Sequence, residues 1–189
     1  MVKDFILASQ SPQRKALLEQ IKCMPKQIMP ADIDETPKKG EKPSQYVKRM
    51  ALEKAKKVFE ENKGQIILAS DTIIVCGTKI IQKSKTDEEQ TKVMQLLSGK
   101  THRVLTAVCV INREGKQSVK LNTTKIKMKR LTQKEVEYYV SSKEWVGCAG
   151  YKIEGVMAGF VKQIIGSNSG VIGLPLYETR QLLIGAGVM

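Results

Sequence analysis

The chain alternates short apolar runs with amphipathic stretches, and this order limits the folds that it can adopt. Phe5 to Ala8 has the composition of a strand, and Ser11 to Ile21 carries its apolar residues on one helical face. A strand that leads directly into a helix is typical of α/β proteins. The second half is richer in strand signals, with Val104 to Ile111 and Ser118 to Lys129 on either side of a predicted turn. We therefore expect a mixed α/β fold.

Capping residues mark where the predicted helices begin. Ser44 precedes an apolar stripe at helical spacing, and Thr86 and Thr132 each stand three residues before a glutamate, the pattern of a capping box. The last helix is expected to begin at Pro175. The segment from Pro30 to Pro43 lacks apolar periodicity and is expected to be a long loop, and loops of that length are often functional.

Length and residue usage favour one cytoplasmic domain. The 189 residues suffice for one substantial core and are too few for two independent domains of ordinary size, so we expect a single domain covering residues 1–189. Eighteen apolar residues never run together, and the opening residues lack the apolar segment of a secretory signal. The four cysteines are far apart and form no C-x-x-C pair, which favours reduced thiols.

The formal net charge of +13 is compatible with two kinds of partner. A basic balance can bind nucleic acid or attract a small polyanion. The 26 lysines far outnumber the 6 arginines and are scattered, and aromatic residues make up only 5%. Base readout and stacking favour arginine and aromatic side chains, so a dedicated nucleic-acid binder is the less favoured interpretation.

The junction between the first strand and the first helix is a candidate phosphate site. Ser11 can cap the helix with Pro12 as its first residue, which leaves free backbone N–H groups at the positive end. Arg14 lies in the first turn, where a cation opposes the helix dipole unless an anion compensates it. The alternative is a plain capped helix with a surface arginine.

Asp71 and Thr72 interrupt the otherwise apolar stretch from Ile66 to Val75. We expect strands at Ile66 to Ala69 and Ile73 to Cys76, on either side of these two residues. A carboxylate in a buried strand is costly unless it is paired or bound to a metal ion. Asp71 is therefore a candidate to hold a divalent cation and to accept a proton from water. The alternative is a strand end that faces solvent.

Other polar residues give weaker signals. Asp32, Asp34 and Glu35 offer oxygen ligands suited to Mg²⁺ or Mn²⁺, although acidic loops are often only solvated. Lys54 adjoins the apolar stripe of its helix, so its ammonium either enters a cleft or extends past the stripe into solvent. The single histidine, His102, has no metal partner at a suitable spacing and is expected in a capping or turn role.

Taken in order, seven short motifs resemble the Maf family of nucleotide pyrophosphatases. Each motif alone is common, but together they span nearly the whole chain in the family's order. The motifs are Leu7 to Arg14 with Leu17-Leu18, Asp34 to Thr36, Glu53 to Ala55, Ala69 to Thr72, Leu97 to His102, Ala149-Gly150 with Ile153 to Gly155, and Gly173 to Leu176.

This resemblance implies a curved mixed sheet with flanking helices in two lobes around a cleft, similar to inosine triphosphate pyrophosphatases. It also implies a homodimer that uses a divalent cation, Mg²⁺ or Mn²⁺, to hydrolyse nucleoside triphosphates between the α and β phosphates. By the same resemblance, Asp71 is the proton acceptor and a metal ligand, and Glu35 is the second metal ligand. The family's phosphate-binding positions are Ser9, Arg14, Lys54 and Lys83 here.

Three positions that distinguish base preference within the family give different indications. Thr72 is the residue of the subgroup that hydrolyses dTTP and UTP, whereas Glu154 resembles the subgroup that acts on 7-methyl-GTP. Gln13 matches neither subgroup, which carry arginine and tryptophan there. The sequence leaves the preferred base open. The family's proline after Lys83 is replaced by Ser84.

The favoured hypothesis is a metal-dependent nucleoside triphosphate pyrophosphatase for nucleotide-pool cleaning, with arrest of division implied by the resemblance alone. Two other functions remain open. One is a non-enzymatic module that binds nucleic acid or a division protein on the same fold. The other is a phosphatase that removes only the terminal phosphate.

Overall fold

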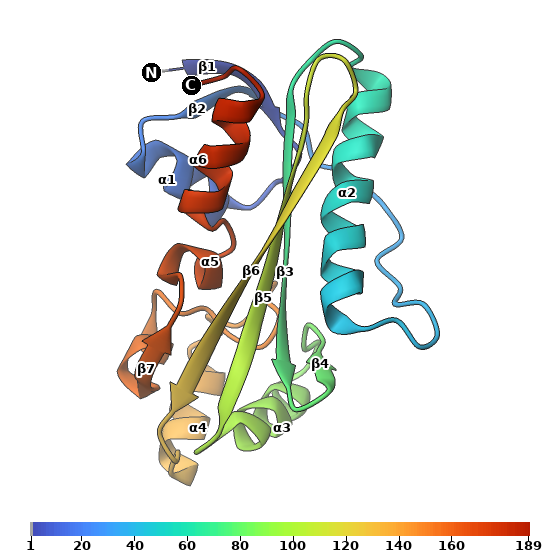
Figure 1. Ribbon diagram of the computed structural model, residues 1–189. Coiled ribbons are helices and arrows are strands. Elements are labelled where there is room, and N and C mark those ends of the chain that lie inside the picture. Colours follow the sequence, from blue (N-terminus) through green and yellow to red (C-terminus); the bar gives the residue numbers. More distant parts are fainter. Residues whose placement is uncertain (1) are drawn as a thin grey trace.

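The computed structural model describes residues 2–189 and contains a mixed seven-stranded sheet flanked by helices (Figure 1). The strand order is β2-β1-β3-β5-β6-β7, with β4 paired to the C-terminal end of β3. Pairing is parallel among β2, β1 and β3 and antiparallel elsewhere. The strands are β1 (Val2–Leu7), β2 (Met24–Ile28), β3 (Ile67–Cys76), β4 (Lys79–Ile81), β5 (Thr101–Ile111), β6 (Gln117–Met128) and β7 (Val161–Ile165).

Helices cover both faces of the sheet and one end of its long strands. In Figure 1, α2 lies along one side of the long strands, α1 and α6 lie on the other, and α3 and α4 lie at the opposite end. Within residues 2–189, none of the helices is long and apolar enough to cross a bilayer. The helices are α1 (Pro12–Gln20), α2 (Pro43–Glu61), α3 (Asp87–Leu97), α4 (Gln133–Ser141), the 3₁₀ helix η1 (Val156–Phe160), α5 (Asn168–Ile172) and α6 (Leu176–Gly185).

Three hydrophobic clusters hold these layers together. One packs the stripe of α2, including Met50 and Ala55, against one sheet face, and the second packs Leu18 of α1 and Leu183 of α6 against the other. The third fills the lobe of α3 and α4 around Tyr139. Strands β3 and β5 contribute to all three clusters and so join the lobes. The expected two-lobed mixed α/β architecture is confirmed.

Capping predictions succeeded at three helices and failed at one. The side chains of Ser11, Thr86 and Thr132 each accept a backbone hydrogen bond at the start of a helix. The prediction of Ser44 as the cap of α2 was wrong, because the helix begins one residue earlier at Pro43, whose fixed φ suits the first helical position.

The interruption expected at Asp71 and Thr72 is also absent. β3 runs without a break, and these residues pair with Ala107 and Thr106 in the middle of the strand. Side chains alternate between sheet faces, so Asp71 shares the face of Ile73, which belongs to the α2 cluster. The alternation explains why the polar pair does not end the strand: each side chain finds polar partners on its own face.

Candidate active site

Arg14 is held at the start of α1 by one neighbour in sequence and by one group from the far end of the chain. Its Nη1 donates to Ser9 Oγ at 2.8 Å, and its Nε donates to the carbonyl oxygen of Gly173 at 2.9 Å. Ser70 Oγ donates to the same carbonyl at 2.9 Å. Burial lowers the pKa of Arg14, opposed by the charge of Asp71, but a guanidinium stays protonated in proteins. A fixed positive charge therefore sits at the N-terminal end of the helix.

Lys54 of α2 joins two carboxylates. Its Nζ lies 2.6 Å from Asp71 Oδ1 and 2.7 Å from Glu35 Oε1. The Lys54 and Asp71 side chains are only 12% and 11% exposed, whereas Glu35 on its loop is 46% exposed. The buried carboxylate thus has the partner that its position in an apolar strand requires. Of the two readings of Lys54, the one that directs it into a cleft is correct.

Positive charge surrounds Glu35 on several sides. Burial opposes ionisation of this carboxyl, but the hydrogen bond and charge of Lys54, with the charges of Lys83 and Arg14, outweigh it and lower the pKa. Glu35 is therefore an anion at neutral pH. The charges reach it from three separate elements, although Glu35 itself lies outside any helix or strand.

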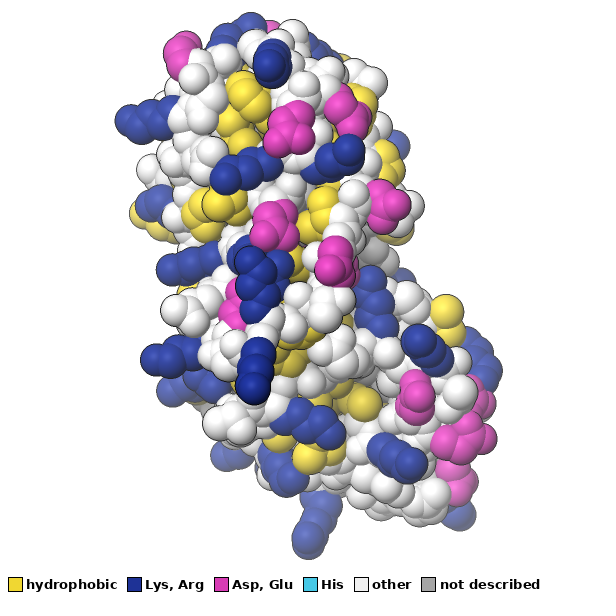
Figure 2. All heavy atoms as spheres, turned by 90° about the vertical axis from the view of Figure 1, so that its right-hand side faces the viewer, with side chains coloured by type: hydrophobic (Ala, Val, Ile, Leu, Met, Phe, Trp, Pro, Cys, Tyr) yellow, Lys and Arg dark blue, Asp and Glu magenta, His cyan; other side chains and the backbone are white. Residues whose placement is uncertain are grey.

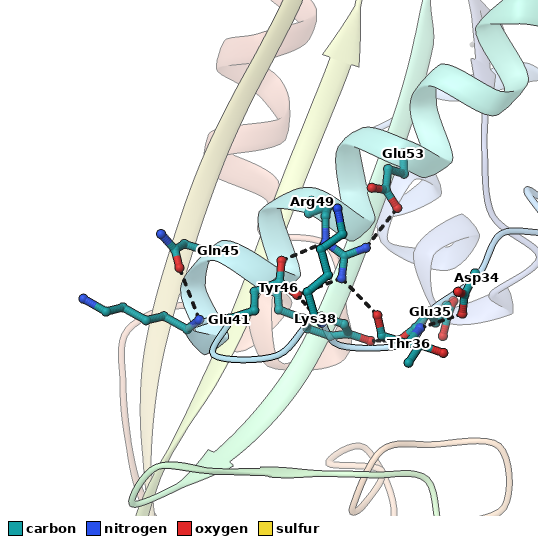
Figure 3. Close-up of polar contacts among 10 residues, drawn as sticks. Asp34, Glu35, Thr36, Lys38, Glu41, Gln45, Tyr46, Arg49 and Glu53 are labelled. Atoms are coloured by element: carbon teal, nitrogen blue, oxygen red, sulfur yellow. Dashed lines mark hydrogen bonds and ion pairs between the residues drawn. The ribbon is translucent and has the colours of Figure 1, made fainter.

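The loop that carries Glu35 is fastened to α2 (Figure 3). The Tyr46 hydroxyl donates to the carbonyl oxygen of Glu35 at 2.7 Å, and Arg49 Nη2 donates to that of Thr36 at 3.1 Å. Arg49 also makes a two-pronged contact with Glu41, at 2.7 Å from both Nε and Nη2. Neither Tyr46 nor Arg49 was expected to serve the site.

These groups open onto one cleft of about 860 Å³ between the lobes. All nine residues that the family resemblance assigns to the site line it, including Lys83, which forms a β-bridge with Ala149, and Glu154, two residues before η1. Residues far apart in sequence therefore form one site. The expected residues in the cleft are Ser9, Gln13, Arg14, Glu35, Lys54, Asp71, Thr72, Lys83 and Glu154.

Residues 4–186 match the family described as Maf-like protein. The chain belongs to the Maf family. A dTTP/UTP pyrophosphatase from Zymomonas mobilis subsp. mobilis is 47% identical over 188 residues, which are 99% of this chain and 93% of that protein. A dTTP/UTP pyrophosphatase from Mesorhizobium japonicum is 41% identical over 194 residues, again 99% of this chain and 93% of the relative.

A solved structure shares the fold of this Maf-family chain. A HAM1 protein from Coxiella burnetii superposes with a TM-score of 0.52 at 18% identity, covering 96% of this chain and 98% of that one. At this identity the likeness concerns the arrangement of elements only. It agrees with the two-lobed mixed sheet described above.

Thr72 faces away from Asp71, toward the α5 side of the sheet. Thr106 Oγ1 lies 3.1 Å from Thr72 Oγ1 and donates to the carbonyl oxygen of Gly170 at 2.7 Å. The pair ties β3 and β5 to α5 at the cleft wall. No local pattern indicates the role of Thr106, because its partners are 34 and 64 residues away along the chain.

Three weaker predictions fared differently from the main set. Asp32 and Asp34 are exposed and do not line the cleft, and Asp34 Oδ1 instead accepts a bond from Thr36 N at 2.9 Å within the loop. His102 is in a strand and 2% exposed, with Nε2 at 2.6 Å from the Tyr151 hydroxyl. The expected capping or turn role of His102 was wrong, because β5 carries it into the core of the second lobe.

Of the carboxylates that line the cleft of the Maf-family chain, Glu35 and Asp71 meet at one point and are the candidate metal donors. Within residues 2–189, no cluster of three or more His, Cys, Asp or Glu side chains could hold an ion. Mg²⁺ in phosphate-handling sites is bound through one or two carboxylates plus phosphate oxygens and water. Glu35 and Asp71 already share one cation, the Lys54 ammonium. Their chemistry and closeness fit a divalent ion that enters with a polyphosphate.

Proposed function

We propose that this chain is a nucleoside triphosphate pyrophosphatase that releases a nucleoside monophosphate and pyrophosphate. The observation that carries the proposal is the cleft in which Lys54 joins Glu35 and Asp71, next to Arg14 at the start of α1. Carboxylates for a cation and several positive groups for phosphates are the parts that this chemistry requires. The names of the two relatives support the same activity.

In this proposal each residue has a defined task. Asp71 accepts the proton of the attacking water, and Glu35 and Asp71 hold the divalent cation, Mg²⁺ or Mn²⁺. When bound, the cation supplies positive charge beside the phosphate oxygens. Arg14, Lys54 and the more exposed Lys83 bind the phosphate chain and balance the charge that builds up as the bond between the α and β phosphates breaks.

Ser9 positions Arg14 through their 2.8 Å hydrogen bond, so it serves the phosphates indirectly as well as by its place in the cleft. Gln13, Thr72 and Glu154 are proposed to contact the base. We propose thymine and uracil as the preferred bases, because Thr72 has the residue type of that subgroup and both relatives are named for dTTP and UTP.

A substrate panel tests this function. The purified chain is incubated with dTTP, UTP, CTP and 7-methyl-GTP in Mg²⁺ or Mn²⁺, and the products are separated by ion exchange. We expect pyrophosphate and the monophosphate, with dTTP and UTP consumed fastest. Diphosphate and orthophosphate would indicate a terminal phosphatase. No turnover together with steeply salt-dependent DNA or RNA binding would favour the binding module.

The charge distribution gives the binding module little support. On the face shown in Figure 2, lysine and arginine side chains are spread out with acidic side chains among them, and they form no continuous basic stripe. Nucleic-acid binding usually requires a clustered basic footprint. In this proposal the positive charge on this face serves to attract the triphosphate.

The remaining parts of the proposal concern the setting of the enzyme. We propose a homodimer on the family resemblance. Sedimentation equilibrium would test it, with a monomer mass as the contrary result. We also propose a cytoplasmic location, with which the free thiols of the four cysteines agree. The division-arrest role rests on family resemblance alone.

A further inference from the structure

We propose that Tyr46 and Arg49 are positioning residues for the reaction. By holding the backbone of residues 35 and 36, they keep the Glu35 carboxylate against Lys54. This inference rests on the proposed function, since it concerns the same cleft. Neither side chain is assigned a step in the chemistry itself.

Glu35 needs such support because of where it lies. Lys54 is on a helix and Asp71 is in the middle of a strand, but residues 29–42 contain no helix or strand. A carboxylate on an irregular segment is free to leave its partners, and ordering that segment costs conformational entropy. The larger exposure of Glu35, 46% against 12% for Lys54 and 11% for Asp71, reflects this position.

Tyr46 and Arg49 supply two consecutive anchors. Tyr46 binds the carbonyl of Glu35 and Arg49 binds that of Thr36, so two adjacent peptide units are fixed to one face of α2 (Figure 3). Tyr46 is 6% exposed. A tyrosine hydroxyl is protonated at neutral pH and can donate to the carbonyl of Glu35.

The guanidinium of Arg49 is itself held rigidly. Glu41 receives two of its N–H groups at 2.7 Å, Glu53 receives a third at 3.1 Å, and the group lies 5.5 Å from the centre of the Tyr46 ring. Glu41 also accepts from Lys38 N at 3.1 Å. Arg49 thus holds the part of the loop that leads into α2 against that helix, which also carries Lys54. Forked contacts of this kind are stronger and more directional than single ones.

The first test combines single and double variants. Arg49→Met and Tyr46→Phe should each lower kcat for dTTP with Mn²⁺ by about 10- to 100-fold, the usual effect of losing a group that orients a metal or substrate ligand. In a Glu35→Gln background the same changes should lower kcat by less than about twofold, since residues acting through one carboxylate are not additive. Equal losses in both backgrounds would overturn the inference.

Controls separate positioning from general stability. Glu53→Gln removes the longer contact of Arg49, at 3.1 Å to a 38% exposed side chain, and leaves the forked contact with Glu41 and both loop contacts in place, so kcat should stay within about twofold of wild type. Arg49→Lys keeps a charge without the forked geometry and should lower kcat even if the melting temperature is unchanged. A Glu53→Gln loss as large as that of Arg49→Met would count against the inference.

The second test needs no turnover. Hydrogen–deuterium exchange of residues 33–38, measured without nucleotide or metal, should be faster in Arg49→Met and Tyr46→Phe than in wild type and Glu53→Gln. Unchanged exchange would overturn the inference. Because this measurement is independent of catalysis, it still decides whether the two residues hold the loop if wild type hydrolyses no triphosphate, a result that would defeat the proposed function alone.

Discussion

Lys54 organises the candidate site at the level of single residues. Its ammonium contacts the carboxylates of Glu35 and Asp71 at 2.7 and 2.6 Å, which balances two negative charges in a partly buried space. Removing one member of such a group leaves the others uncompensated. The three side chains should therefore be studied as a unit.

Asp71→Asn should lower kcat by roughly 100-fold or more, because the variant loses the proposed proton acceptor and a metal ligand. The fold should persist, since asparagine has the same size. Steady-state kinetics and a thermal melt would measure both. Asp32→Asn, an exposed carboxylate outside the cleft, is the matched control. Turnover of Asp71→Asn close to wild type would remove Asp71 from the mechanism.

The only histidine has a role in stability and none in the proposed chemistry. His102 is 2% exposed, and within residues 2–189 its Nδ1 has no hydrogen-bond partner. Burial lowers the pKa of His102 to about 4. The unfolded chain, with a pKa near 6.5, therefore binds this proton more readily than the folded one.

It follows that His102 makes stability depend on pH in acid. The contribution of His102 to the free energy of unfolding is fully present above pH 6.5. As the pH falls toward 4, the free energy of unfolding decreases by about 3 kcal/mol in total, because this side chain is only 2% exposed. His102→Gln should lack this loss. Urea unfolding of both proteins at pH 7 and 4.5 would measure the difference. Equal losses in the two proteins would show that His102 is not the cause.

At the scale of elements, the turn between α5 and α6 connects the end of the chain to its beginning. Gly173 has φ 132°, and its carbonyl oxygen accepts from both Arg14 and Ser70 at 2.9 Å. A built Cβ at Gly173 would lie 3.6 Å from Arg14 Nε and from Thr72 Oγ1. The space is sufficient, so the backbone conformation is what requires glycine there.

Gly173→Ala should therefore destabilise the protein by about 1–3 kcal/mol, the cost of forcing a side chain into this backbone region. It should also raise KM for the triphosphate, because a shifted carbonyl no longer orients Arg14. Chemical denaturation and steady-state kinetics would report the two effects. Gly185→Ala is the control, since Gly185 lacks positive φ and nothing lies within 4 Å of its Cβ position. Equal changes in the free energy of unfolding and in KM for the two variants would show that the backbone conformation at Gly173 does not require glycine.

At the scale of the whole molecule, the cleft lies between two lobes that have their own cores. One lobe contains the clusters on either side of the sheet, and the other contains the cluster of α3 and α4. Long strands pass through both, so the lobes are joined by backbone hydrogen bonds as well as by packing. The cores are formed by apolar side chains. That the whole of residues 1–189 folds as one domain stays a prediction.

Ligand binding should stabilise this arrangement. A non-hydrolysable triphosphate with Mn²⁺ at 100 times its Kd should add about 2.7 kcal/mol, which raises Tm by about 5–10 °C for a chain of this size. A chelator alone should stop turnover while Tm stays constant. Differential scanning calorimetry would measure these shifts in Tm. In the Asp71→Asn variant the ligand should raise Tm by less than in wild type. Unfolding by the chelator would assign the ion a structural role.

Features fixed by neighbours in sequence were predictable. The caps at Ser11, Thr86 and Thr132 and the β5–β6 hairpin depend on hydrogen bonds within a few residues, and alternating apolar runs set the mixed α/β class. The motif order pointed to the nine cleft residues. Ser44 failed because a proline one position earlier is an equally good start for a helix.

What the tertiary structure alone decided is which distant residues meet. The continuity of β3 depends on pairing with β5, and the burial of His102 depends on Tyr151, 49 residues away. The contacts of Tyr46 and Arg49 with the Glu35 loop leave no periodic signal, because they join a helix to irregular backbone. Local sequence specifies the elements through short-range bonds, whereas the site arises from long-range contacts made only after those elements pack.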